Sequence, residues 1–220
     1  YWKKFSKFFK KKKINFTPIS RDNYKNFTSF KFEYLINAAM PSKRFWAKNN
    51  PELDFEETVN KTIFFIKNFN YKKFIHISSV SARCQSSTVY GINKKKSENV
   101  VLQNLNNLVL RLGPMYGDGL DKGVLIDMLN SKTVYINENS KYSFTDVSWV
   151  CEWIVGNLNL YRGIKEIGSK DYFTLSQIAK KINSKSAFEG DVDNQIIIDD
   201  EKYSSKSNDV LIFLKNLIKN

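Results

Sequence analysis

Strand-like apolar runs alternate with helical segments along the first half of the chain. The apolar runs cover residues 14–20, 32–40, 72–80 and 107–113, and the helical pattern is clearest at 51–69. Parallel strands need a long crossover connection, usually a helix, whereas antiparallel strands can be joined by a tight turn. The alternation therefore predicts an α/β fold built on a doubly wound parallel sheet with right-handed crossovers.

The pattern changes after Gly113. A glycine-rich loop, "GPMYGDGLDKG", is followed by shorter and less regular elements. We place a domain boundary there, with a first domain over residues 1–113 and a smaller lobe over residues 114–220. The elements expected in this lobe are a helix at 122–130, a strand at 133–137, a loop leading into a helix at 143–158, and helices at 173–183 and 207–220.

The chain begins with Tyr1, within a helical pattern of aromatic and lysine residues, and its first glycine is Gly91. A doubly wound nucleotide-binding domain normally opens with a strand and a glycine-rich turn that holds phosphate at a helix N-terminus. We therefore expect the sequence to be a fragment that lacks this first strand and loop. Such a fragment is expected to bind a dinucleotide weakly and to be inactive by itself.

The formal net charge is +13, and most of the basic residues are lysines. This balance is typical of a solvated lysine-rich surface or of a protein that binds a polyanion. The spread of lysines over the whole chain favours the first, so a nucleic-acid partner is not expected. Cys84 and Cys151 lie far apart, which indicates reduced thiols in a cytoplasmic protein without a metal site. No apolar run approaches the ~18 residues that a membrane span needs, so no membrane partner is expected.

Tyr90 and Lys94 share one face of a predicted helix, because they are four positions apart. A tyrosine hydroxyl has a pKa of about 10, and a cation held close lowers it. Ser78 and Ser79 end the third predicted strand, and ligands of open α/β sheets bind at the carboxyl ends of strands. These residues suit proton exchange with a carbonyl or alcohol. The Tyr–Lys spacing alone is weak, because a solvated helix face in a lysine-rich chain explains it equally well.

The surroundings of this pair resemble the extended short-chain dehydrogenase/reductase family, of the NAD(P)-dependent nucleotide-sugar epimerase/dehydratase type. The resemblance covers almost the whole chain. The blocks that carry it, in the family's order, are "LINAAM", "DFEETVNKTIFFI", "FIHISSVSA", "VYGINKKKSE", "LVLRLGPMYGDG", "YSFTDVSWVCEWI" and "GIKEIGSKDYFTLSQIAKKI". The implied fold is a Rossmann-like doubly wound parallel sheet, lacking its first strand and Gly-rich loop, with a smaller C-terminal α+β substrate lobe.

The resemblance also implies roles for individual residues. The catalytic residues implied are Ser79, Tyr90 and Lys94. The cofactor-binding residues implied are Ser20, Arg21, Ala38, Ala39, Asn60, Ser78, Tyr90, Lys94, Pro114 and Tyr116. The substrate-binding residues implied are Ser79, Met115, Lys122 and Asp146. Arg111 either joins Lys122 on substrate phosphates or is paired inside the fold, and His76 is expected to be packed rather than catalytic.

The expected cofactor is NADP. Ser20 and Arg21 end the run at 14–20, where this fold meets the adenosine ribose, and an arginine there pairs with a 2′-phosphate. NAD is the alternative if Arg21 is only a surface residue.

The expected function is that of an epimerase or a ketosugar reductase acting on a nucleotide-sugar. Dehydration is not expected, because dehydratases of the family carry an Asp-Glu pair where this chain has "SVSA". A non-catalytic dinucleotide- or RNA-binding member of the same fold is an alternative, and so is a reductase of a non-sugar ketone. Family members often dimerise through the helices that correspond to those of Asn60 and Tyr90, so a homodimer is expected by analogy.

Overall fold

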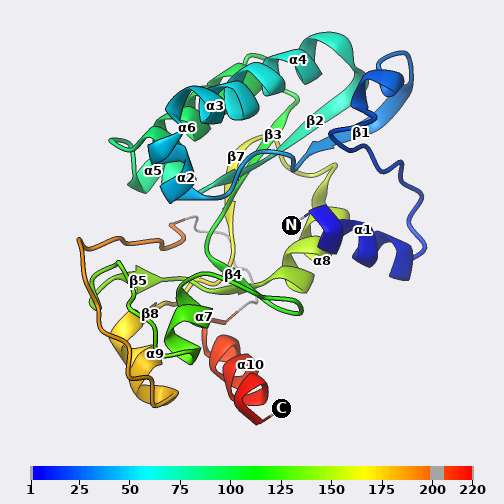
Figure 1. Cartoon of the computed structure of the whole chain (residues 1–220). Helices are drawn as coiled ribbons and strands as arrows, with labels where there is room; N and C mark the ends of the chain where they lie inside the picture. The colour runs from blue at the N-terminus through cyan, green and yellow to red at the C-terminus, as the bar shows by residue number, and fades with distance from the viewer. Residues whose placement is uncertain (1, 199–205, 220) are drawn as a thin grey trace. The chain divides into compact units, whose positions relative to one another are not determined.

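The computed structural model describes the backbone of residues 2–198 and 206–219 (Figure 1). It forms two compact units, which share three elements of the chain. Unit 1 holds Tyr1–Arg111 and Cys151–Lys165, and unit 2 holds Leu112–Val150 and Glu166–Asn220. The domain boundary that we place after residue 113 stays a prediction.

Unit 1 is built on a parallel sheet. Its strands are β1 (Lys31–Asn37), β2 (Asn70–Ser79), β3 (Leu108–Leu112) and β7 (Gly163–Ile167), in the order β1-β2-β3-β7. β1 runs parallel to β2, with Asn37 opposite His76 at their carboxyl ends. The last six residues of β2 before Ser79 are all buried, as in strands covered on both faces. The Rossmann-like α/β fold that the sequence predicts is therefore confirmed.

Helices cover the sheet and place the residues of interest at its carboxyl edge. In Figure 1, α3, α4 and α6 lie along one side of the sheet. The predicted helix at 51–69 is confirmed, but it contains one wide turn, η2 (Glu56–Asn60), between α3 (Pro51–Phe55) and α4 (Lys61–Asn68). The helices of this unit that precede β3 are α1 (Trp2–Lys11), η1 (Tyr24–Phe27), α2 (Arg44–Asn49), α3, η2, α4, α5 (Ser81–Cys84) and α6 (Val89–Val101).

Two predicted strands are wrong. Residues 14–20 form no strand, and β1 has only β2 as a neighbour within the described sheet. Pro18 has no N–H to donate to a ladder, and alternation of apolar residues does not by itself supply a pairing partner. In the run at 133–137, only Val134 makes an isolated bridge, to Phe188. The chain turns again directly after it, which leaves no length for a regular strand.

Unit 2 consists of short elements around its own apolar core. Its strands and helices are β4 (Met115–Tyr116), α7 (Val124–Leu129), β5 (Lys141–Tyr142), β6 (Thr145–Asp146), the start of α8 (Val147–Asn157), β8 (Phe173–Thr174), α9 (Leu175–Lys181) and α10 (Asn208–Lys219). The largest buried core side chains include Met128, Phe144, Leu175 and Leu214. The predicted helix at 173–183 is confirmed as α9, and Thr174 and Gln177 form a reciprocal capping box at its start.

A buried ion pair joins α6 to the sheet. Arg111 of β3 donates to Glu98 of α6 through Nε at 2.9 Å and through a terminal nitrogen at 2.7 Å. Ser78 of β2 donates to the same carboxylate at 2.7 Å. Glu98 is fully buried and Arg111 nearly so. Of the two expected outcomes for Arg111, pairing inside the fold is the one observed.

Replacing Arg111 alone is expected to destabilise the protein strongly. Arg111→Met leaves a buried carboxylate without its main partner, which should lower the free energy of unfolding by about 3–5 kcal/mol. The double variant Glu98→Met/Arg111→Leu removes both charges and should lose less. Urea unfolding measures both, with exposed Lys48→Met as the control. A loss below about 1 kcal/mol in Arg111→Met would show that the pair does not hold α6 in place.

Candidate functional site

Tyr90 and Lys94 lie together in the first turns of α6. The Lys94 amine is 5.1 Å from the centre of the Tyr90 ring and donates to the Pro41 carbonyl at 3.0 Å. Both side chains are buried. The helix begins after Thr88, whose hydroxyl accepts from the Gly91 N–H at 3.1 Å as an N-cap. A solvated helix face, the other explanation for the spacing of this pair, is therefore ruled out, because both side chains are buried.

Gly91 lets α6 pack closely on the segment that follows Ser79. A Cβ at position 91 would lie 2.7 Å from the Ser81 carbonyl oxygen and would also collide with the backbone of Gln85. Contacts this short do not occur with real side chains, so only glycine fits. Ser79 ends β2, and its hydroxyl accepts from the Ser81 N–H at 3.2 Å. The start of α6 therefore lies against the chain that leaves the catalytic serine candidate.

Burial lowers the pKa of the Lys94 amine to about 7. The negative charges of Asp54 and Glu98 oppose this fall. At neutral pH the amine is thus balanced between its two protonation states. The protonation state of Lys94 can therefore change with the charge of the Tyr90 phenol beside it.

A chain of hydrogen bonds runs behind the pair, from the end of β1 to α6. Asn37 donates through Nδ2 to the Nδ1 atom of His76 at 3.4 Å, so the other ring nitrogen of His76 carries the proton. That nitrogen lies 3.0 Å from the Ser97 hydroxyl, which donates to the Lys94 carbonyl at 2.8 Å. His76 is fully buried, and burial lowers its pKa to about 3. His76 is therefore packed, as expected.

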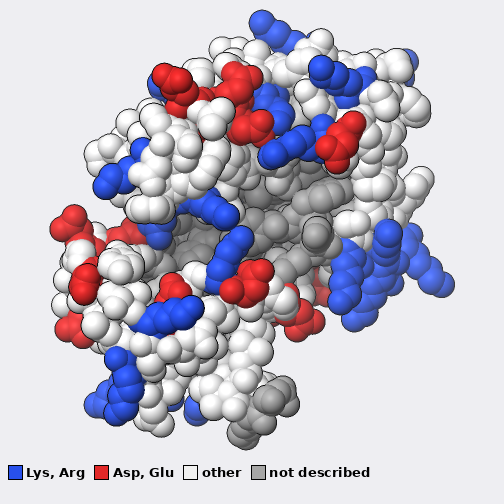
Figure 2. All heavy atoms as spheres, viewed as in Figure 1, with Lys and Arg blue, Asp and Glu red and all other residues white. Residues whose placement is uncertain are grey.

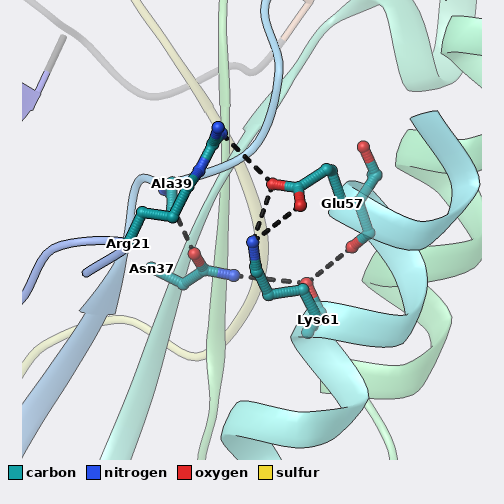
Figure 3. A network of polar contacts seen from close by, with 7 residues as sticks. Arg21, Asn37, Ala39, Glu57 and Lys61 are labelled. Atoms are coloured by element: carbon teal, nitrogen blue, oxygen red, sulfur yellow. Dashed lines mark hydrogen bonds and ion pairs between the residues drawn. The ribbon is translucent and has the colours of Figure 1, made fainter. Parts of the chain in front are cut away.

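A second polar group lies at the carboxyl end of β1 (Figure 3). Lys61 donates to both oxygens of Glu57, at 2.8 and 2.7 Å, and Arg21 reaches the same carboxylate at 3.3 Å. Nearby, the Ala39 N–H donates to the Asn37 side chain at 3.2 Å. Arg21 is largely exposed, whereas Lys61 is mostly covered. The Arg21 and Lys61 side chains thus share the Glu57 carboxylate, near the exposed residue Ala39 (Figure 3).

Several predicted site residues use their polar groups inside the protein. Ser78 donates to Glu98, and Asn60 donates to the Glu56 carboxylate at 2.6 Å on an exposed face. Both the N–H and the hydroxyl of Ser20 bond to the Asn23 side chain. Ala38 makes no such bond and is half-buried at the end of β1. Their assignment to a cofactor site stays a prediction.

The remaining predicted residues lie in unit 2. Met115 and Tyr116 form β4, and Tyr116 is paired with Asp146 of β6. The Asp146 carboxylate accepts from the N–H groups of Ser148 and Trp149 and so caps α8. Burial raises the pKa of Tyr116, and the charges of Asp146 and Asp209 raise it further. Pro114 precedes β4, and Lys122 is exposed in the loop before α7, so their predicted roles are neither supported nor opposed.

Sequence reasoning missed three charged residues near these groups: Asp54, Glu57 and Lys61. Asp54 is fully buried in α3 and accepts from the Asn93 side chain at 2.9 Å. A helical wheel through residues 54, 58 and 62 would have shown polar side chains on the face turned to the core. No pattern would have shown the wide turn that brings Glu57 and Lys61 to the end of β1.

Charge on the surface is mixed. Figure 2 shows lysine and arginine side chains gathered over α1, and elsewhere on the visible face they are interspersed with acidic ones. Among the described residues, no cluster of histidine, cysteine and acidic side chains could hold a metal ion. No helix in the described part of the chain is long and apolar enough to cross a membrane.

No family model and no curated protein sequence matches the chain. Solved structures do match. The UDP-glucose 4-epimerase of Thermotoga maritima, solved with UDP-glucose, has a TM-score of 0.64 at 18% identity, over 78% of this chain and 69% of that one. The Bordetella bronchiseptica enzyme WbmG, solved with NAD and UDP, has a TM-score of 0.70 at 13% identity, over 90% and 74%.

A third similar structure is the UDP-glucuronic acid 4-epimerase of Bacillus cereus, solved with UDP-glucuronic acid and NAD. Its TM-score is 0.64 at 18% identity, over 84% of this chain and 76% of that one. The chain therefore has the fold of nucleotide-sugar epimerases of the extended short-chain dehydrogenase/reductase family. The resemblance in the sequence is confirmed at the level of the fold.

Protonation of His76 is expected to weaken the protein in acid. Its folded pKa of about 3 lies below the ordinary value of 6.5, so its contribution is complete above that value and is lost as the pH falls toward 3. Between roughly pH 6 and pH 4, His76→Asn should flatten the fall in unfolding free energy by about 1.4 kcal/mol per pH unit. Urea unfolding across this range measures both proteins. Identical slopes would contradict a buried neutral histidine.

Proposed function

We propose that the protein is an NAD(P)-dependent epimerase or ketosugar reductase acting on a nucleotide-sugar. The observation that carries this proposal is the buried Lys94 amine beside the Tyr90 ring, at the start of a helix that packs against the chain leaving Ser79. A phenol, an amine and a hydroxyl at the carboxyl edge of a parallel sheet suit proton exchange with a sugar hydroxyl or ketone.

In this mechanism Tyr90 moves the proton. The positive charge of Lys94 stabilises the phenolate, so that the phenol gives up its proton nearer neutral pH. The Ser79 hydroxyl, at the half-buried end of β2, holds the same substrate oxygen. A bound nicotinamide dinucleotide would supply the acceptor and donor of the hydride. Lys94 has a second task, which is to hold the ribose next to the nicotinamide.

The residues at the end of β1 fit a dinucleotide. Ala38 and Ala39 have small side chains, so a planar ring or a ribose can approach the backbone there. Arg21 offers an exposed guanidinium a short distance away, at the Glu57 carboxylate. We assign Ser20, Arg21, Asn60, Ser78, Pro114 and Tyr116 to the same cofactor, and we favour NADP because a guanidinium pairs well with a 2′-phosphate.

The substrate assignment rests on similarity of fold. The similar enzymes were solved with UDP-glucose, with UDP, and with UDP-glucuronic acid. We assign Ser79, Met115, Lys122 and Asp146 to the nucleotide-sugar. A homodimer and a cytoplasmic location belong to the same proposal.

Removing the phenol should abolish the reaction while sparing the cofactor. Tyr90→Phe keeps the ring beside Lys94 but has no proton to exchange, so turnover of UDP-sugars by the full-length protein should fall by at least about a hundredfold. NADPH binding should be unchanged. Tyr135→Phe, at an exposed tyrosine, is the matched control. Undiminished turnover in Tyr90→Phe would rule out the proton-transfer role.

The cofactor preference should depend on Arg21 and Glu57 in opposite directions. Arg21→Ala should raise the Kd for NADPH roughly tenfold, about 1.4 kcal/mol, and leave that for NADH nearly unchanged. Glu57→Gln frees both cations and should lower the Kd for NADPH. Fluorescence titration of the full-length protein measures each value, with Glu52→Gln, at an exposed acid of α3, as the control. Equal changes for both cofactors would argue against a 2′-phosphate at Arg21.

A further inference from the structure

Asp54 is a buried carboxylate that the mechanism above does not use. It lies in α3 and is fully buried. One oxygen accepts from the Asn93 amide at 2.9 Å, and the other has no hydrogen-bond partner among the described residues. A carboxylate in such a place is costly unless a positive charge offsets it.

Lys94 is the neighbouring basic side chain, and among the described residues it has no carboxylate within ion-pair distance. The residue is only 3% exposed, and its amine donates its hydrogen bond to a neutral carbonyl. Of the carboxylates that act on it, Glu98 is already paired with Arg111 through two short hydrogen bonds and lies 3.7 Å from Lys95. Among the described residues, the Asp54 carboxylate accepts a hydrogen bond only from the neutral amide of Asn93. Burial raises the pKa of Asp54, and the Asn93 hydrogen bond and the charge of Lys94 oppose this rise, so the carboxylate and the amine each favour the charged form of the other.

Other charged groups lie on the elements packed against α6, but they are engaged elsewhere or exposed. Glu57 binds Arg21 and Lys61, and Glu56 binds Asn60. His76, behind the amine, is neutral. The remaining charged side chains on the neighbouring elements are Lys43, Arg44 and Lys48 at α2, Glu52 on α3, Lys67 on α4, Lys72 and Lys73 on β2, and Arg83 on α5. The charges that raise the pKa of Lys94 against the effect of burial are those of Asp54 and Glu98.

We propose that Asp54 is a positioning residue, the buried counter-charge that keeps the Lys94 amine protonated beside Tyr90, with Asn93 holding its carboxylate in place. The inference rests on the proposed function for its consequence, because a protonated amine is what stabilises the Tyr90 phenolate. It also gives the buried Asn93 side chain a role, because its amide reaches the carboxylate on α3.

The test measures Lys94 directly. The protein is labelled with 13C and 15N in lysine, and the Lys94 signal is assigned by its loss in Lys94→Arg. In the protein without a substitution at position 54, NMR titration of this signal should give a midpoint of about 7. In Asp54→Asn, which keeps the shape of the side chain and its hydrogen bond, the midpoint should fall by about one pH unit. Glu52→Gln, at an exposed acid on the same helix, should leave it unchanged.

A reciprocal exchange separates charge from structure. Asp54→Asn/Asn93→Asp keeps one carboxylate and one amide in contact but moves the charge to the other side of the hydrogen bond. Its midpoint should return to near the wild-type value, and the alkaline side of the pH–turnover profile should shift with it. The exchange variant also tests the proposal if Asp54→Asn does not fold. An unchanged midpoint in Asp54→Asn, or an unrestored one in the folded exchange variant, would overturn the inference.

The two proposals fail in different ways. If the protein is not an epimerase or reductase, Tyr90→Phe leaves its activity unchanged while the NMR midpoint still reports on Asp54. If Asp54 is not the counter-charge, the midpoint stays constant while Tyr90→Phe still loses turnover.

Discussion

The candidate site of unit 1 depends on a lysine amine held out of water. Moving an ammonium group into a protein interior is unfavourable unless nearby groups offset the charge. Here the Lys94 amine is bound by the Pro41 carbonyl and lies near the Tyr90 ring. Pro41 lies in the segment between β1 and α2, whereas Tyr90 lies on α6 itself, one turn before Lys94. The position of α6 against the sheet therefore decides whether the site exists.

That position is held by contacts that surround the candidate site. The Glu98–Arg111 pair joins the middle of α6 to β3, and Gly91 allows its first turn to approach α5 without a side chain between them. Ser97 links the same helix to His76 and, through it, to the end of β1. A rigid helix with one polar face can thus present a tyrosine and a lysine in a fixed relation, which is a condition for proton transfer.

The sequence was sufficient for the parts of the fold that depend on local pattern. The parallel sheet, the Tyr90 helix and the helix α9 could be predicted, because periodicity acts over a few residues. The strands at 14–20 and 133–137 were wrong because a strand needs a neighbour that its own residues do not specify. Likewise, Asp54 looked like an ordinary acid in a helix, since its burial depends on Asn93, which is 39 residues away.

The buried charges of this region balance. Lys94 and Arg111 are the cations, Asp54 and Glu98 are the anions, and His76 remains neutral because burial opposes its protonation. A balanced interior explains how the fold tolerates so many ionisable groups beside one another. It also couples stability to chemistry. The two carboxylates that offset the cost of the buried amine also raise the pKa of that amine. A change to any one of the four charges must therefore alter both the folding free energy and the protonation of Lys94.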